Sequence, residues 1–154
     1  WTDPYMDNSQ VIVVKKDSGI NTLADLAGKV VEVQKESAAE TALNDEEHAD
    51  LTASFAQLLS VGEYNTAFMD LESGAVDAVA IDIGVAQFQI EGKEDQYQIL
   101  DETISSEQYA VGFFLGNTAL RDEVQSTLLE MVEDSTFAEI SNQYFGYDVC
   151  TLGK

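Results

Sequence analysis

Two short stretches of the sequence carry side chains that could bind a small charged ligand. The first is Ser37-Ala38-Ala39-Glu40, whose serine and glutamate have the spacing of a helix capping box. In such a box Ser37 accepts a hydrogen bond from the amide of Glu40, and Glu40 reaches back to the amide of Ser37. The start of a helix also exposes amide donors and the positive end of its dipole, which suit a carboxylate or a phosphate. Taken alone, the motif is better explained by a cap that only satisfies its own helix, because capping boxes are common.

The second stretch ends at Asp82, which directly follows the apolar residues 78–81. A carboxylate at the end of a buried strand is partly desolvated, so it needs a partner: a backbone amide, an arginine or a ligand ammonium group. For Asp82 alone, a structural role is the simpler interpretation. Together, the two stretches offer donors for an anion and a carboxylate for a cation. That pair is the complement of a zwitterion such as an amino acid. No glycine-rich run accompanies Ser37, so we do not expect a nucleotide.

Strands and helices alternate around these residues, which predicts an α/β fold with a mostly parallel sheet. Strand-like runs lie at 10–14, 29–33, 55–61, 76–81, 97–100 and 108–115. Helical patterns lie at 22–27, 37–43, 64–73, 84–90, 120–132 and 136–145. In open α/β sheets the ligand binds beyond the carboxyl ends of the strands. Both stretches follow strands, so we expect them at one edge of the sheet.

The composition narrows the class of partner. Seven basic residues stand against 29 acidic ones among 154, for a net charge of -22. Such a surface repels nucleic acid and anionic lipid, so we expect neither as a partner. No apolar run approaches the ~20 residues of a membrane-spanning helix, and residues 1–4 do not resemble a signal peptide. We therefore expect a mature protein or an excised piece of one. The single cysteine, Cys150, excludes an internal disulfide.

Five segments, in order along the chain, resemble solute-binding proteins of polar amino acid ABC importers (family 3 type). They include a Leu-x-Asp-Leu-x-Gly-Lys-x-Val signature and a Gly-x-x-Asp-Ala strand; the five lie at residues 1–5, 23–31, 74–79, 108–113 and 136–146. The resemblance implies a periplasmic binding protein type II fold, with two lobes joined by hinge strands. Residues 1–14 would enter the first hinge, and residues 15–107 would form the α/β ligand-binding second lobe. Residues 108–154 would supply the second hinge strand and C-terminal helices that belong to the first lobe.

The resemblance also implies the site residues. Ser37 and Ala38 match a Thr-Gly turn that holds the ligand's α-carboxylate, Asp82 takes its α-ammonium, and Gln34 faces its side chain. Glu36 departs from the pattern, because glycine is common at that position. Neither a cofactor nor a metal is implied. The implied partners are an amino acid and the membrane permease, at an extracellular or periplasmic location with an N-terminal anchor ahead of this chain.

The family's first lobe would also precede Trp1. Without it, apolar stripes on the C-terminal helices would lack their usual partner, so we expect them to self-associate. The stripes are Leu120, Val124, Leu128, Met131 and Val132, and Phe137, Ile140, Tyr144 and Phe145.

Two alternative functions stay open at this point. The same fold resembles cyclohexadienyl dehydratases, but the only histidine, His48, lies in an acidic run typical of solvated surface. A metal site in that run, at 45–50, is the less favoured interpretation. Solute-binding domains also serve as extracellular sensors of signalling receptors. We predict a transport-associated binding protein rather than an enzyme.

Overall fold

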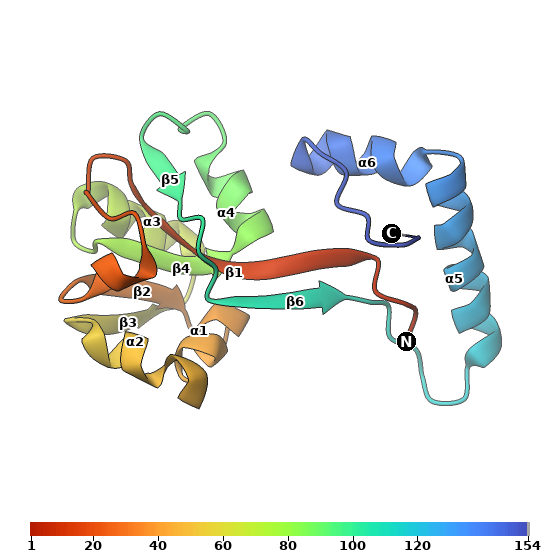
Figure 1. Cartoon of the computed structure of the whole chain (residues 1–154), viewed down its shortest axis with the longest axis horizontal. Coiled ribbons are helices and arrows are strands. Elements are labelled where there is room, and N and C mark those ends of the chain that lie inside the picture. The colour runs from red at the N-terminus through yellow and green to blue at the C-terminus, as the bar shows by residue number, and fades with distance from the viewer. Residues whose placement is uncertain (154) are drawn as a thin grey trace. The chain divides into compact units, whose positions relative to one another are not determined.

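The computed structural model describes residues 1–153 (Figure 1). Its internal contacts divide the chain into two compact units. One unit is formed by residues 9–106, and the other by Trp1–Asn8 with the residues from Glu107 onward. The chain passes between them within strand β1 (Met6–Lys15) and again within strand β6 (Ser105–Tyr109).

A sheet in the order β3-β2-β4-β1-β5 organises the unit of residues 9–106, and β6 pairs with β1 outside this order. The remaining strands are β2 (Val30–Gln34), β3 (Gln57–Val61), β4 (Ala78–Asp82) and β5 (Tyr97–Ile99). β2 runs parallel to β3 and β4, whereas β1 is antiparallel to both β4 and β5. Four of the five strands in the order therefore point the same way, which confirms the mostly parallel α/β sheet.

Both faces of this sheet are covered. The helices of the unit are η1 (Leu23–Leu26), α1 (Ala38–Leu43), η2 (Glu46–His48), α2 (Ala49–Ser54), α3 (Tyr64–Ser73) and α4 (Ile83–Ile90). One core cluster joins Ala78 and Ala80 of β4 to residues of η1 and α1, and the other joins Val79 and Ile81 to α3 and α4. Successive side chains of a strand point to opposite faces. Burial on both faces explains why the sequence of β4 is a continuous run of apolar residues before Asp82.

A single carboxylate, that of Glu32, is buried within β2. Its side chain is 2% exposed, and its Oε2 atom has no hydrogen-bond partner among residues 1–153. Val31 and Val33 pack in the first cluster, so Glu32 points to the opposite face, on which α3 lies. Burial raises the pKa of Glu32 above its ordinary value, and the nearby charge of Asp70 in α3 raises it further.

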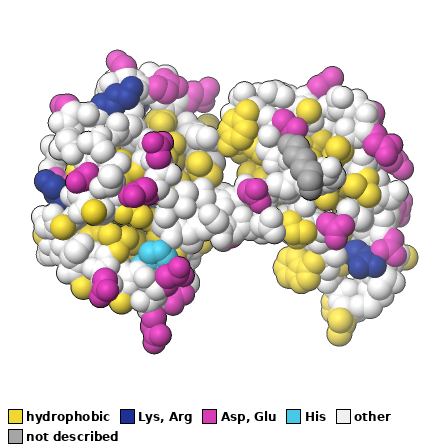
Figure 2. All heavy atoms as spheres, in the orientation of Figure 1, with side chains coloured by type: hydrophobic (Ala, Val, Ile, Leu, Met, Phe, Trp, Pro, Cys, Tyr) yellow, Lys and Arg dark blue, Asp and Glu magenta, His cyan; other side chains and the backbone are white. Residues whose placement is uncertain are grey.

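The second unit contains two helices, α5 (Thr118–Glu133) and α6 (Thr136–Phe145), with little buried surface. No residue of α5 is buried, and Ser141 is the buried residue of α6. Several large apolar side chains of this unit are exposed, among them Trp1, Phe114, Leu115, Leu120, Ile140 and Tyr144. Figure 2 shows, on the visible face, Asp and Glu side chains spread among few Lys and Arg side chains. Self-association through the apolar stripes stays a prediction.

The expected strand at 108–115 is wrong in its bounds, because β6 ends at Tyr109. Beyond it, Val111 exchanges hydrogen bonds with Thr2: its carbonyl accepts from the Thr2 amide and its amide donates to the Thr2 hydroxyl, each at 2.9 Å. Phe114 and Leu115 are 88% and 94% exposed. An apolar run becomes a strand only where a neighbouring strand accepts its backbone hydrogen bonds, and residues 112–115 have no such neighbour in the described chain.

Candidate ligand-binding site

The candidate site lies at the carboxyl edge of the sheet in the unit of residues 9–106. Gln34 ends β2, Val61 ends β3 and Asp82 ends β4. Gln34 and Val61 are partners in the parallel β2–β3 register, so the turns that follow these strands meet at one edge. All four residues predicted to contact a ligand are in or next to these turns: Gln34, Ser37, Ala38 and Asp82.

The turn after β2 is held by local hydrogen bonds. Ser37 is the N-cap of α1, and its Oγ accepts from the amide of Glu40 at 3.1 Å, as the capping motif predicts. The side-chain amide of Gln34 donates to the carbonyl of Gly62, in the turn after β3, at 3.1 Å. Ala38 is the first residue of α1, a position at which no carbonyl within the helix can accept the amide hydrogen.

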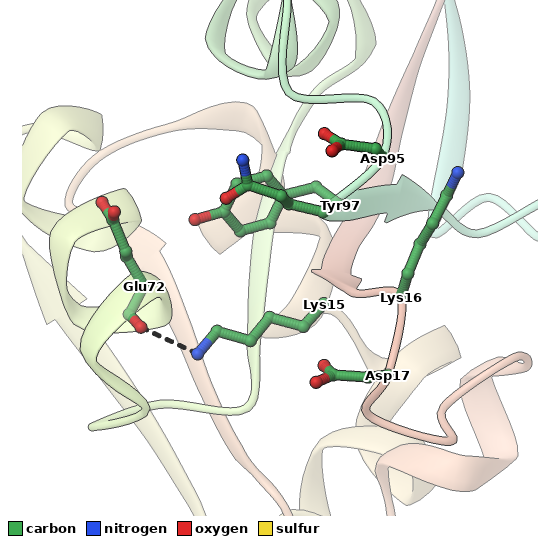
Figure 3. Close-up of a pocket in the computed structure, with 7 residues that line it drawn as sticks. Lys15, Lys16, Asp17, Glu72, Asp95 and Tyr97 are labelled. Carbon is green, nitrogen blue, oxygen red and sulfur yellow. Dashed lines mark hydrogen bonds between the residues drawn. The ribbon is translucent and has the colours of Figure 1, made fainter.

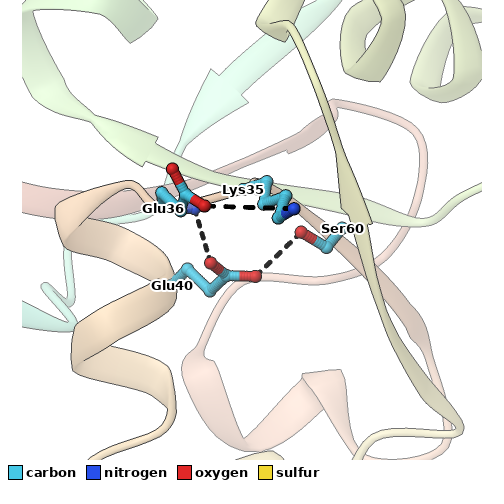
Figure 4. A network of polar contacts seen from close by, with 4 residues as sticks. All are labelled: Lys35, Glu36, Glu40 and Ser60. Atoms are coloured by element: carbon cyan, nitrogen blue, oxygen red, sulfur yellow. Dashed lines mark hydrogen bonds and ion pairs between the residues drawn. The ribbon is translucent and has the colours of Figure 1, made fainter.

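The other half of the predicted capping box is wrong. The carboxylate of Glu40 does not reach the amide of Ser37; its Oε2 accepts from the amide of Glu36 at 2.6 Å. Its Oε1 accepts from the hydroxyl of Ser60, on β3, at 2.8 Å (Figure 4). The amide of Ser37 donates to the carbonyl of Gln34 instead. The hydrogen bond from Glu36, and then that from Ser60, lower the pKa of Glu40 below its ordinary value.

The backbone of Glu36 explains this exchange of partners. Glu36 has a φ of 61°, in the left-handed region that favours glycine. The chain therefore turns sharply, which closes the turn on Gln34 and presents the Glu36 amide to Glu40. The Glu36 side chain is 84% exposed, and its Oε1 lies 3.9 Å from the Nζ of Lys35. Its carboxylate is thus solvated, next to a cation.

Glu36→Gly is expected to raise the unfolding free energy of the chain by about 1 kcal/mol, because it removes the cost of a left-handed side-chain residue. Chemical denaturation measures this change. Lys35→Gly is the matched control, since Lys35 is also exposed but has no positive φ. It should lower the stability through added chain entropy. Equal effects of the two glycines would contradict the prediction.

Asp82 has a structural partner in the chain. Its Oδ1 accepts from the amides of Gly84 at 2.9 Å and Val85 at 3.3 Å, which makes Asp82 the N-cap of α4. A carboxylate at the end of a buried strand needs a partner, and two backbone amides supply at least part of it for Asp82. These bonds fix the direction of the carboxylate at the edge of the sheet.

Tyr64 is a member of this edge that the sequence analysis missed. In the sequence it falls at the start of the helical pattern at 64–73, and its ring packs against the core cluster that contains Phe68 and Leu71. The pKa of its hydroxyl is nevertheless affected by two residues of the candidate site, Ser37 and Asp82. The pKa of Tyr64 is raised above its ordinary value, first by burial and also by the charge of Asp82, whereas the side chain of Ser37 acts in the lowering direction. The position of Tyr64 just after β3 was a signal that could have identified it.

A separate pocket of about 370 Å³ lies away from these residues (Figure 3). It is lined by Lys15, Lys16, Asp17, Glu72, Asp95, Gln96 and Tyr97. Lys15 ends β1, and its neighbour Val14 pairs with Ala78 at the start of β4, so the pocket lies at the opposite edge of the sheet. The Nζ of Lys15 donates to the carbonyl of Glu72 at 2.7 Å, which satisfies a carbonyl near the end of α3.

Residues 1–153 offer neither a metal site nor a membrane-spanning helix. No group of three or more His, Cys, Asp or Glu side chains could hold a metal ion. Within the same range, none of the helices has the length and apolar character needed to cross a bilayer.

Comparison with known proteins defines the class. The chain matches, over residues 5–149, the family described as "ABC transporter, phosphonate, periplasmic substrate-binding protein". The match covers most of the chain, so the chain belongs to this family of periplasmic substrate-binding proteins.

Individual relatives narrow the resemblance to amino acid-binding members. ABC transporter arginine-binding protein 1 of Escherichia coli K12 is 30% identical over 151 residues, covering 94% of this chain and 58% of the relative. The glutamine-binding protein GlnH of Bacillus subtilis is 27% identical over 148 residues, covering 96% and 52%. An ABC uptake substrate-binding protein of Streptococcus pneumoniae, solved with bound histidine, superposes with a TM-score of 0.83 at 30% identity, covering 97% and 62%.

The chain spans about half the length of the curated relatives it matches, 58% and 52% of the two named above. By their names these relatives are binding proteins, not enzymes.

Proposed function

We propose that the protein carrying this chain is the substrate-binding component of an amino acid ABC importer. Residues 9–106 would supply one of the two lobes that hold a polar amino acid. The observation that carries the proposal is the convergence of Ser37, Ala38 and Asp82 at one sheet edge. It occurs in a family of substrate-binding proteins whose relatives include ones named for arginine and glutamine and one solved with bound histidine.

The chemistry of this edge suits both charged groups of an amino acid. The ligand carboxylate would accept from the Ser37 hydroxyl and the Ala38 amide, at the start of α1. The exposed carboxylate of Glu36 lies beside Lys35, which reduces its repulsion of an anion there. The ligand ammonium would lie on the carboxylate of Asp82. The α4 amides already hold that carboxylate, so little rotamer freedom is lost when ligand binds.

The remaining parts of the proposal concern the whole protein. Gln34 would face the ligand side chain from the end of β2. The permease of the importer would be the protein partner. The location would be extracellular or periplasmic, with a membrane anchor ahead of this chain.

A calorimetric panel tests the proposal on the protein that carries this chain. We expect at least one polar amino acid to bind among the twenty, and residues 1–154 alone to bind it much more weakly, because half of a clamp leaves the ligand solvated. Phosphonates belong in the panel, because the family description names them. Binding of phosphonates in place of amino acids would overturn the substrate class. Tight binding by residues 1–154 alone would overturn the two-lobe account. Conversion of prephenate to product would establish the alternative of a cyclohexadienyl dehydratase.

A further inference from the structure

Gln10 of β1 is a polar side chain buried in the unit of residues 9–106. It is 2% exposed, although glutamine is a residue type that usually lies at the surface. Residues 11–14, which follow it in β1, are all apolar and buried. An apolar side chain at position 10 would continue that run without the cost of taking an amide out of water. Packing alone therefore does not account for the glutamine.

The strand pairing places Gln10 opposite Asp82. The two residues are partners in the antiparallel register of β1 and β4. Directly opposite residues of an antiparallel pair point to the same face of the sheet, with their Cβ atoms about 5 Å apart. A glutamine side chain has two N–H donors, and an ionised carboxylate only accepts. The pairing thus sets a buried donor beside the carboxylate that is proposed to hold the ligand ammonium.

The face on which this pair lies is the one that α1 covers. Ile12 and Ala80, two positions away along β1 and β4, pack in the core cluster that contains residues of α1. Side chains two positions apart on a strand share a face, so Gln10 and Asp82 lie on the α1 face. Ser37, proposed for the ligand carboxylate, is the N-cap of α1. Gln10 therefore belongs to the face of the sheet on which the candidate site is built.

We propose that Gln10 is a positioning residue for Asp82: its side-chain amide donates to the Asp82 carboxylate and orients it toward the ligand ammonium. The amides of Gly84 and Val85 hold Oδ1 from the α4 side, and Gln10 holds the carboxylate from the β1 side. A carboxylate held from two sides loses less rotamer freedom when ligand binds. The inference rests on the proposed amino acid site and deepens it. Gln10 contributes to recognition of the ammonium, which all amino acids share, and not to selection among their side chains.

The test is Gln10→Met in the protein that carries this chain, because methionine keeps an unbranched side chain of similar length and removes its donors. We expect calorimetry to give a Kd raised about 3- to 10-fold, the usual effect of one lost hydrogen bond. The factor should be the same for each amino acid that binds. It should vanish for an N-acetylated amino acid, which has no ammonium, and in the background of Asp82→Ala. A purely structural role for the glutamine would raise Kd equally with and without the Asp82 carboxylate.

Gln98→Met is the matched control. Gln98 of β5 pairs with Val14 of β1, which places it on the same face of the sheet as Gln10 but near the opposite edge, and its amide donates to the carbonyl of Ile20 at 2.8 Å. Its replacement removes a side-chain hydrogen bond of the same kind and should leave Kd unchanged. Unchanged binding by Gln10→Met, or an equal loss with and without the Asp82 carboxylate, would overturn the inference and leave the proposed function intact. Failure of the unaltered protein to bind any amino acid would overturn both.

Discussion

Asp82→Asn is expected to weaken amino acid binding ~30- to 1,000-fold, a loss of about 2–4 kcal/mol, while the unfolding free energy stays nearly constant. The two effects should separate because the proposed function gives Asp82 a second role beside capping. Its Oδ1 caps α4 through the amides of Gly84 and Val85, and asparagine is an equally good cap. The negative charge that would pair with the ligand ammonium is lost. Calorimetry measures the affinity, and chemical denaturation measures the stability.

Asp82→Ala is the informative comparison, because alanine removes the cap as well as the charge. It should match the asparagine variant in affinity and also lose about 1 kcal/mol of stability. An N-acetylated amino acid, which has no ammonium, should bind poorly and about equally to the unaltered protein and to Asp82→Asn. If Asp82→Asn bound amino acids as tightly as the unaltered protein, the ammonium would not lie on Asp82, and its role would be limited to capping α4.

The second large effect is expected at Glu32, where Glu32→Gln should stabilise the chain by about 1–3 kcal/mol at neutral pH. Glu32 is 2% exposed, its Oε2 has no hydrogen-bond partner among residues 1–153, and Asp70 acts on it as a like charge. An amide of the same shape removes the cost of the buried charge. Thermal unfolding of the two proteins measures the difference.

The pH dependence has a definite sign. Burial and then Asp70 raise the pKa of Glu32 above its ordinary value of 4.5. A raised pKa in the folded state contributes stability below 4.5, and this contribution is lost as the pH rises through the folded-state pKa. The advantage of Glu32→Gln should therefore be small below 4.5 and grow toward neutral pH.

Glu40→Gln provides a control of opposite sign. The pKa of Glu40 is lowered by its hydrogen bonds from Glu36 and Ser60, so its contribution is present above 4.5 and is lost as the pH falls. This variant should be less stable than the unaltered chain at neutral pH, with the difference shrinking in acid. A stability difference for Glu32→Gln that did not change with pH would show that Glu32 is not the titrating group.

Much of the architecture could be predicted from local patterns in the sequence. The apolar runs predicted most strands of the sheet, the serine–glutamate spacing predicted the start of α1, and the helical pattern at 64–73 predicted α3. Each of these signals depends on residues within a few positions of one another. The placement of the candidate residues also followed, because parallel strands bring the turns at their carboxyl ends together.

The tertiary structure alone decided the partners of the polar groups. Glu40 bonds Ser60 because the parallel pairing of β2 with β3 brings together residues that are 20 positions apart. Tyr64 lies at the same edge of the sheet as Ser37, because the parallel strands β3 and β2 end there and α3 and α1 begin after them. Glu32 is buried because α3 covers its face of β2, although its residue type predicts exposure. A residue type states which bonds are possible, whereas strand register and packing determine which groups come within hydrogen-bonding distance.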